Sequence, residues 1–149
     1  MTAQFKLSLL NCDRSDPLAD FFDARAAVVY RGLAGETTFF TVAGRDLQAF
    51  VADAGRLRDV AGASALLLGG WDAEKRLRLQ ITGAGFSGAL AARVWIVHDN
   101  PAIDLQTRGV TEFVTSPDAL SAFLKDIQHL VDRREPGDAT LNGDADARA

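Results

Sequence analysis

The chain has 149 residues and a formal net charge of −4, and 48% of its residues are hydrophobic. Nucleic-acid binding depends on a clustered positive surface, so this acidic balance argues against a nucleic-acid partner. The single Cys12 has no partner for an intramolecular disulfide and is typical of a reducing compartment, and the N-terminus lacks the pattern of a secretion signal. The longest apolar run is too short to span a bilayer. We therefore expect a globular, cytoplasmic protein that binds no membrane.

The elements expected in chain order fall into two similar halves, each a strand meander that ends in an amphipathic helix. "TSPDAL" starts the second helix, with Ser116 as its cap, Pro117 at the first position and Asp118 near the positive end of the dipole. The expected strands are residues 5–10, 21–31, 37–42, 64–68, 76–82, 86–97 and 110–115, and the apolar stripes of the helices cover residues 47–57 and 120–131.

The two halves also share residues. At a spacing of 73, residues 38–59 and 111–132 agree at eight of 22 positions, and at a spacing of 65 residues 20–30 match residues 85–95. We interpret this agreement as an internal duplication. The alternative is that any two strand-then-helix segments look alike, because periodicity places apolar residues similarly.

The predicted fold class is α+β. Two tandem strand-meander-plus-helix repeats, at about residues 4–60 and 63–132, form one largely antiparallel sheet of six or seven strands with two helices packed on one face. Neither helix has enough to bury against within its own half, so we expect one core and a single domain over residues 1–133. Residues 134–149 are polar and lack periodicity, which predicts a disordered tail.

Residues suited to catalysis are few. His98 with Asp99 suggests an acid/base pair, but "HDNP" also has the composition of a turn. Cys12 has no evident base beside it, and His129 falls on the polar side of its helix. "GAGFSG" at residues 83–88 leads into a strand, not a helix, so it predicts a hairpin turn instead of a phosphate loop. We expect no catalytic residue, cofactor or metal site.

A partner-binding surface is the more plausible functional feature. The strand at residues 86–97 is apolar on both faces, so Tyr30 and Trp95 are predicted to form an aromatic patch on the sheet face that the helices leave bare. A bulge that flips the side chains of one copy explains the same pattern. Trp71, and the loop expected at residues 98–109 with His98 and Asp99, are further candidates.

Three stretches carry a resemblance to known proteins. "GETTFFTVAGRDLQAFVADAGRL", "LLLGGW" and "TEFVTSPDALSAFLKDI" look like segments of small, uncharacterised bacterial α+β proteins, some of which resemble the immunity proteins of polymorphic-toxin systems. The resemblance covers most of residues 4–132 and implies a non-catalytic protein that binds another macromolecule. The favoured hypothesis is therefore a protein-interaction module. Two alternatives stay open: a small-molecule-binding protein or minor enzyme that uses His98 and Asp99, and a homo-oligomeric module, such as a homodimer, paired through an exposed strand edge.

Overall fold

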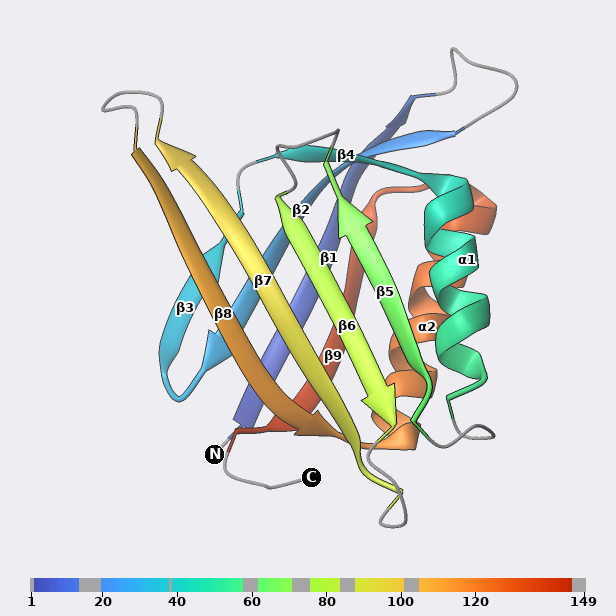
Figure 1. Ribbon diagram of the computed structural model, residues 1–149. Helices are drawn as coiled ribbons and strands as arrows, with labels where there is room; N and C mark the ends of the chain where they lie inside the picture. Colours follow the sequence, from blue (N-terminus) through green and yellow to red (C-terminus); the bar gives the residue numbers. More distant parts are fainter. Residues whose placement is uncertain are drawn as a thin grey trace.

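The structure, a computed structural model, describes residues 2–13, 20–37, 39–57, 62–70, 76–83, 88–100 and 105–145, with the side chains of residues 13, 98–100 and 105–108 left aside. Two helices and a nine-stranded sheet form an α+β fold (Figure 1). The elements are β1 (Thr2–Asp13), β2 (Phe21–Tyr30), β3 (Leu33–Glu36), β4 (Phe40–Ala43), α1 (Gly44–Gly55), β5 (Ser64–Gly69), β6 (Leu77–Gly83), β7 (Leu90–Asn100), β8 (Leu105–Thr115), α2 (Pro117–Arg133) and β9 (Gly137–Asp144).

The sheet is antiparallel and curls back on itself. Its order is β3-β2-β1-β9-β8-β7-β6-β5, and β4 also pairs with β2. Figure 1 shows β5 to β8 as one layer and β1, β2, β3 and β9 as the layer behind it, with both helices on the same side. At one corner β8 pairs with β9 through Val114 and Thr115. At the other, the N–H of Gly70 donates to the carbonyl of Thr41 over 3.1 Å, which joins the end of β5 to β4.

Close contacts between glycine and phenylalanine form both corners. A Cβ on Gly69 would lie 2.6 Å from Cδ2 of Phe40, and a Cβ on Gly143 would lie 2.5 Å from the carbonyl oxygen of Val114 and overlap the ring of Phe113. Only glycine lets the two strands at each corner approach so closely, because real Cβ atoms do not come this near to other atoms. Each corner therefore depends on a glycine, Gly69 or Gly143, which has no side chain of its own.

The helices pack their predicted stripes into one shared core. Leu47, Phe50 and Ala54 of α1 are buried, and Phe123 of α2 meets Phe5 and Phe50 edge to face, with ring centroids 5.9 and 6.4 Å apart. Such arrangements suit the ring quadrupoles and add to the gain from burial. The predicted start of α2 is confirmed, since Oγ of Ser116 accepts from the N–H of Ala119 over 3.1 Å. In contrast, α1 begins without a side-chain cap, so tertiary packing must hold its first turn.

Two segments expected to be loops are strands instead. Residues 33–36 form β3, because Arg31 and Gly32 take φ angles of 52° and 80° and so make a two-residue turn with positive φ at both positions. Residues 98–109 are mostly the arms of the β7–β8 hairpin, which keeps its register from Leu90/Thr115 to Asn100/Leu105. In both segments the backbone pairing of the strands extends beyond the apolar core, and a hydropathy pattern gives no signal for strands outside the core. The nine strands therefore exceed the six or seven predicted.

A further strand replaces most of the expected disordered tail. Residues 137–144 form β9, which pairs with β1 from Thr2/Asp144 to Leu9/Gly137 and lies near the middle of the sheet. Only Ala139 and Leu141 of the strand are buried apolar residues, and the intervening side chains are polar. An alternation this short within a polar segment resembles disorder, yet the ladder to β1 satisfies its backbone.

The strands do not follow the predicted spacing of 65. In β2 the buried residues are Phe22, Ala24, Ala26 and Val28, and in β7 they are Leu90, Ala92, Val94 and Ile96. An odd spacing sets the buried face of one strand against the exposed face of the other. A spacing of 68 matches both burial and pairing, because Ala24 faces Phe40 as Ala92 faces Phe113. The mismatch between the apolar faces of residues 21–31 and 86–97 at a spacing of 65 thus comes from the choice of spacing, and the duplication itself stays a prediction.

Candidate partner-binding surface

The outer face of β5 to β8 is a bare sheet surface. Helices α1 and α2 bury their stripes in the shared core, so among the described residues no element covers the opposite side of these four strands. Register fixes which side chains lie together on this face. One row runs through Leu68, Arg78, Trp95 and Val110, and the next through Leu66, Gln80, Arg93 and Glu112.

Trp95 contacts two arginines at the middle of this face. The guanidinium carbons of Arg78 and Arg93 each lie 4.5 Å from the centroid of the Trp95 ring. Nε of Arg93 also lies 3.1 Å from Oε1 of Glu112, and both of these side chains are exposed. An exposed salt bridge adds little stability, and each exposed cation–π contact contributes about 0.5–1 kcal/mol. These contacts therefore serve mainly to hold the indole and the guanidinium groups in a fixed arrangement.

The charge of this surface is opposite in sign to that of the chain. Among its described outward-facing side chains, Arg78 and Arg93 are positive and Glu112 is negative, whereas the whole chain carries −4. Val110 is 54% exposed and Leu66 is 41% exposed, so apolar area flanks the arginines. We call the set Leu66, Arg78, Arg93, Trp95, Val110 and Glu112 the Trp95 surface.

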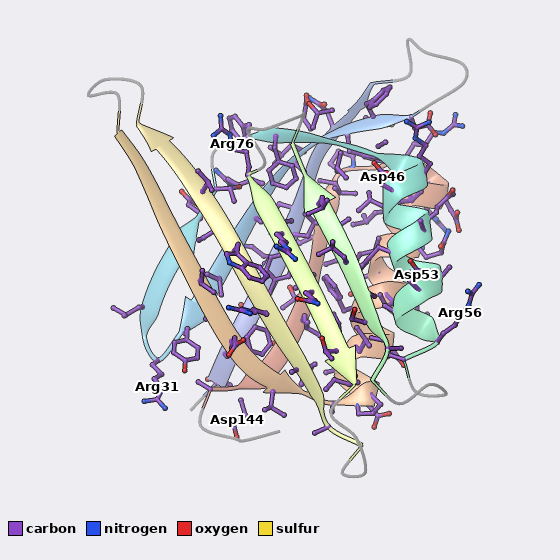
Figure 2. The ribbon with its side chains drawn as sticks, in the orientation of Figure 1. Arg31, Asp46, Asp53, Arg56, Arg76 and Asp144 are labelled. Carbon is purple, nitrogen blue, oxygen red and sulfur yellow. The ribbon has the colours of Figure 1, made fainter. Side chains whose placement is uncertain are left out.

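Tyr30 does not belong to the Trp95 surface. It ends β2 on the side of that strand that carries Val28, and its partly buried ring packs against the core. The guanidinium carbon of Arg31 lies 5.7 Å from its ring centroid. Figure 2 shows Arg31 at the β2–β3 turn, at the margin of the molecule. The predicted Tyr30–Trp95 patch is therefore wrong, because the two residues lie on opposite faces of the curled sheet.

The structure describes the other predicted site residues, Trp71, His98 and Asp99, only in part. Trp71 lies outside the described residues. His98 and Asp99 belong to β7, where their backbones pair with Thr107 and Gln106, but their side chains are outside the described part. The structure thus places both in a regular hairpin arm and not in a turn.

No group of three or more His, Cys, Asp or Glu residues within the described ranges is placed to hold a metal ion. Cys12 is partly buried against the core. On α1, the side chains of Asp46, Asp53 and Arg56 are exposed (Figure 2). None of the helices within the described ranges has the length and apolarity to cross a bilayer.

Two hollows lie away from the Trp95 surface. The larger, of about 540 Å³, lies where β7, β8 and β9 meet the start of α2, and Val114, Pro117 and Gly143 line it. The smaller, of about 280 Å³, lies between the start of α1 and the end of α2. There the Nε of Arg134 lies 2.8 Å from Oδ2 of Asp20, so the charges of the smaller hollow are partly paired.

No protein-family model matches the chain, and no curated protein matches it significantly. The function must therefore be inferred from the geometry.

Of the Trp95 surface, the sequence pointed to Trp95 alone. Arg78 and Glu112 were missed because they join this surface through cross-strand register with Trp95 and Arg93, over loops whose length does not reveal the pairing. The signal that was present is the alternation in β7, where Arg93 and Trp95 share one face.

Proposed function

We propose that this protein is a non-catalytic interaction module that binds a partner protein through the Trp95 surface. The observation that carries the proposal is a tryptophan in contact with two arginines on a bare sheet face. Tryptophan and arginine are the residue types most enriched among those that dominate binding energies at protein interfaces. The contacts with Arg78 and Arg93 also restrict the indole before binding, which lowers the entropy lost on association.

The chemistry of the Trp95 surface favours an acidic partner. Two arginines and one carboxylate leave it positive on an otherwise acidic protein, so an approaching acidic surface is attracted here and repelled elsewhere. Arginine can also form two parallel hydrogen bonds with one carboxylate. A partner that offers carboxylates around an apolar or aromatic group would match both parts of the surface.

A small-molecule function has weaker support. Small-molecule sites are concave and combine apolar walls with a few converging polar groups. Trp95 lines neither of the two hollows among the described residues. The alternative based on His98 and Asp99, whose side chains lie outside the described part, stays second.

An immunity-like role is the form of this function that the resemblance over residues 4–132 favours, with a toxin as the partner.

We also propose that the scaffold arose by duplication. Its support is that β1, β2, β4, α1 and β5 correspond in order and pairing to β6, β7, β8, α2 and β9, with β3 as an addition. In both units, a glycine of the strand that follows the helix contacts a phenylalanine of the strand that precedes the helix. Gly69 contacts Phe40, and Gly143 contacts Phe113.

The experiment compares two arginine–aromatic pairs on different faces. Proteins captured from lysate of the source organism by the wild type are compared with those captured by Trp95→Ala and Arg78→Ala. Phe39→Ala and Arg25→Ala are the matched controls, because Arg25 lies 5.7 Å from the ring of exposed Phe39 on the other layer. A protein retained by the controls and lost with both test variants is purified, and its dissociation constant is measured by calorimetry.

We expect Trp95→Ala to weaken this complex by about tenfold or more, with a smaller loss for Arg78→Ala and weaker binding at high salt. Circular dichroism establishes that each variant is folded. Equal binding by test and control variants, or no capture that depends on Trp95, would overturn the proposal. The purified product of the adjacent gene tests the immunity-like form separately, since failure of that protein to bind removes the toxin partner and leaves the Trp95 surface in place.

A further inference from the structure

The strand edges of this sheet are protected unequally. An edge strand exposes unpaired N–H and C=O groups, which form a template for another strand. The open sides of β5 and β9 are covered by α1 and α2, which pack against them. The β3 edge is only four residues long, and buried Thr37 interrupts the continuation into β4.

The β8 edge has no such protection among the described residues. Of its eleven residues, only Val114 and Thr115 pair with β9, so residues 105–113 have one neighbouring strand, β7. This stretch spans about 30 Å at the usual rise per residue. Its register with β7 contains no bulge, and its sequence "LQTRGVTEF" contains neither proline nor lysine, two of the features that block an edge, although Glu112 is a described charge on it. In Figure 1, β8 forms the free margin of its layer.

We propose that β8 pairs with β8 of a second copy of this chain, antiparallel and with a two-fold axis at Val110. This inference rests on the strand edge and is independent of the partner proposed for the Trp95 surface. The pairing brings residues 107–113 of the two copies together and joins the two layers of β5 to β8 into one continuous sheet. Such an interface is self-complementary, as a two-fold axis requires.

The outward-facing residues determine this register. In a two-fold pairing centred on position n, position n+2 lies opposite position n−2 of the other copy. Centring at Val110 sets the two exposed Val110 side chains opposite each other. Centring at 111 would set Val110 against Glu112, and centring at 112 would set Glu112 against Glu112. An apolar pair is more favourable than a valine opposite a charge, and like charges directly opposite destabilise a strand pair, so we place the axis at Val110.

The pairing also accounts for the exposure of Val110. Val110 lies at the end of the row through Leu68, Arg78 and Trp95, and it is 54% exposed in the single chain. In the pair, each Val110 gains an apolar neighbour, and the two rows join end to end. The two Trp95 rings then lie on the same face of one sheet, so edge pairing covers part of Val110 and Glu112 and leaves Trp95, Arg78 and Arg93 of both copies open.

Molecular mass in solution tests the pairing. We expect the wild type at micromolar concentration to sediment as a dimer, twice the 16.0 kDa of the chain. Val110→Lys sets two lysines opposite each other and should raise the dimer dissociation constant by about tenfold or more. Val29→Lys is the matched control, because Val29 is 39% exposed on β2, which is paired on both sides, and it should leave the dimer intact. A monomeric wild type, or a dimer insensitive to Val110→Lys, overturns the proposal.

Cysteine cross-linking tests the register. In a Cys12→Ser background, Val110→Cys places two thiols opposite each other, at a separation suited to a disulfide. We expect mild oxidation to link this variant rapidly. Glu112→Cys, two residues along the same face, lies opposite position 108 and should link at least about tenfold more slowly. Equal linking of the two variants, or faster linking through Glu112→Cys, rules out the Val110 axis.

Discussion

Replacing Leu141 with alanine tests directly whether residues 137–144 belong to the core. Leu141 lies in β9, and its side chain is fully buried, with 0% exposure. A disordered tail would tolerate the change, because an exposed leucine contributes almost nothing to stability. A buried strand would not, because the substitution removes three carbon atoms and leaves a cavity.

The expected loss follows from these two contributions. Leu→Ala changes at fully buried positions cost about 2–5 kcal/mol, and the cost is largest where neighbours cannot collapse into the cavity. β1 pairs with β9 on one side and α2 packs against it, so collapse is restricted, and we expect a loss of about 3 kcal/mol. This is a large fraction of the roughly 5–15 kcal/mol that stabilises an ordinary domain.

Equilibrium unfolding in urea measures the loss. With a urea m value of about 1.5–2 kcal/mol/M, the midpoint should fall by about 1.5–2 M. Asn142→Ala is the matched control on the adjacent residue, which is exposed and accepts a hydrogen bond from Gln4 over 3.0 Å. It should change the free energy of unfolding by no more than about 0.5 kcal/mol. A loss for Leu141→Ala as small as that of the control would refute a buried β9.

Three more substitutions test other parts of the fold by the same unfolding assay. Thr37→Val leaves the buried N–H of Ala26 without its acceptor, a hydroxyl 3.0 Å away, and should cost about 1–3 kcal/mol; a neutral result would mean that water replaces the hydroxyl. Gly143→Ala forces a methyl group to within 2.5 Å of the carbonyl oxygen of Val114 and should cost about 2 kcal/mol or more; an unchanged midpoint would contradict the tight corner. Gly55→Ala, whose Cβ meets nothing within 4 Å at the end of α1, should stabilise by about 0.5–1 kcal/mol; destabilisation would show that the last turn is not helical.

The helices were predictable because their signals are local. Stripes at spacings of three and four require only the periodicity of one helix, and the start of α2 is set by Ser116 and Pro117 within the same segment. Both expected stripes are buried in the structure. Strand pairing depends on register between distant segments, which no single segment encodes. The expected strands accordingly coincide in most places with real ones, but the curling of the sheet was not foreseen.

β9 was missed although the chain holds a signal for it. Hydropathy alone cannot separate an alternation of two apolar residues from a polar tail. Comparison with β5 does separate them, because the strand after each helix carries alanine, leucine and glycine at alternate positions. At a spacing of 74 the matching pairs are Ala65/Ala139, Leu67/Leu141 and Gly69/Gly143. Extending the repeat beyond the second helix would have placed β9 in the sheet.

The candidate site was predictable only in part, for a reason that also explains its position. The curled sheet encloses the apolar residues of both layers and both helix stripes, so its outer faces need no apolar side chains for folding. On the layer of β1 and β2 the outer face carries Lys6, Asp23 and Arg25, and apolar side chains exposed on this layer include Val29, Leu33 and Phe39. A partly exposed tryptophan held by two arginines on the opposite layer adds little to the core. We propose that this arrangement serves binding instead of folding.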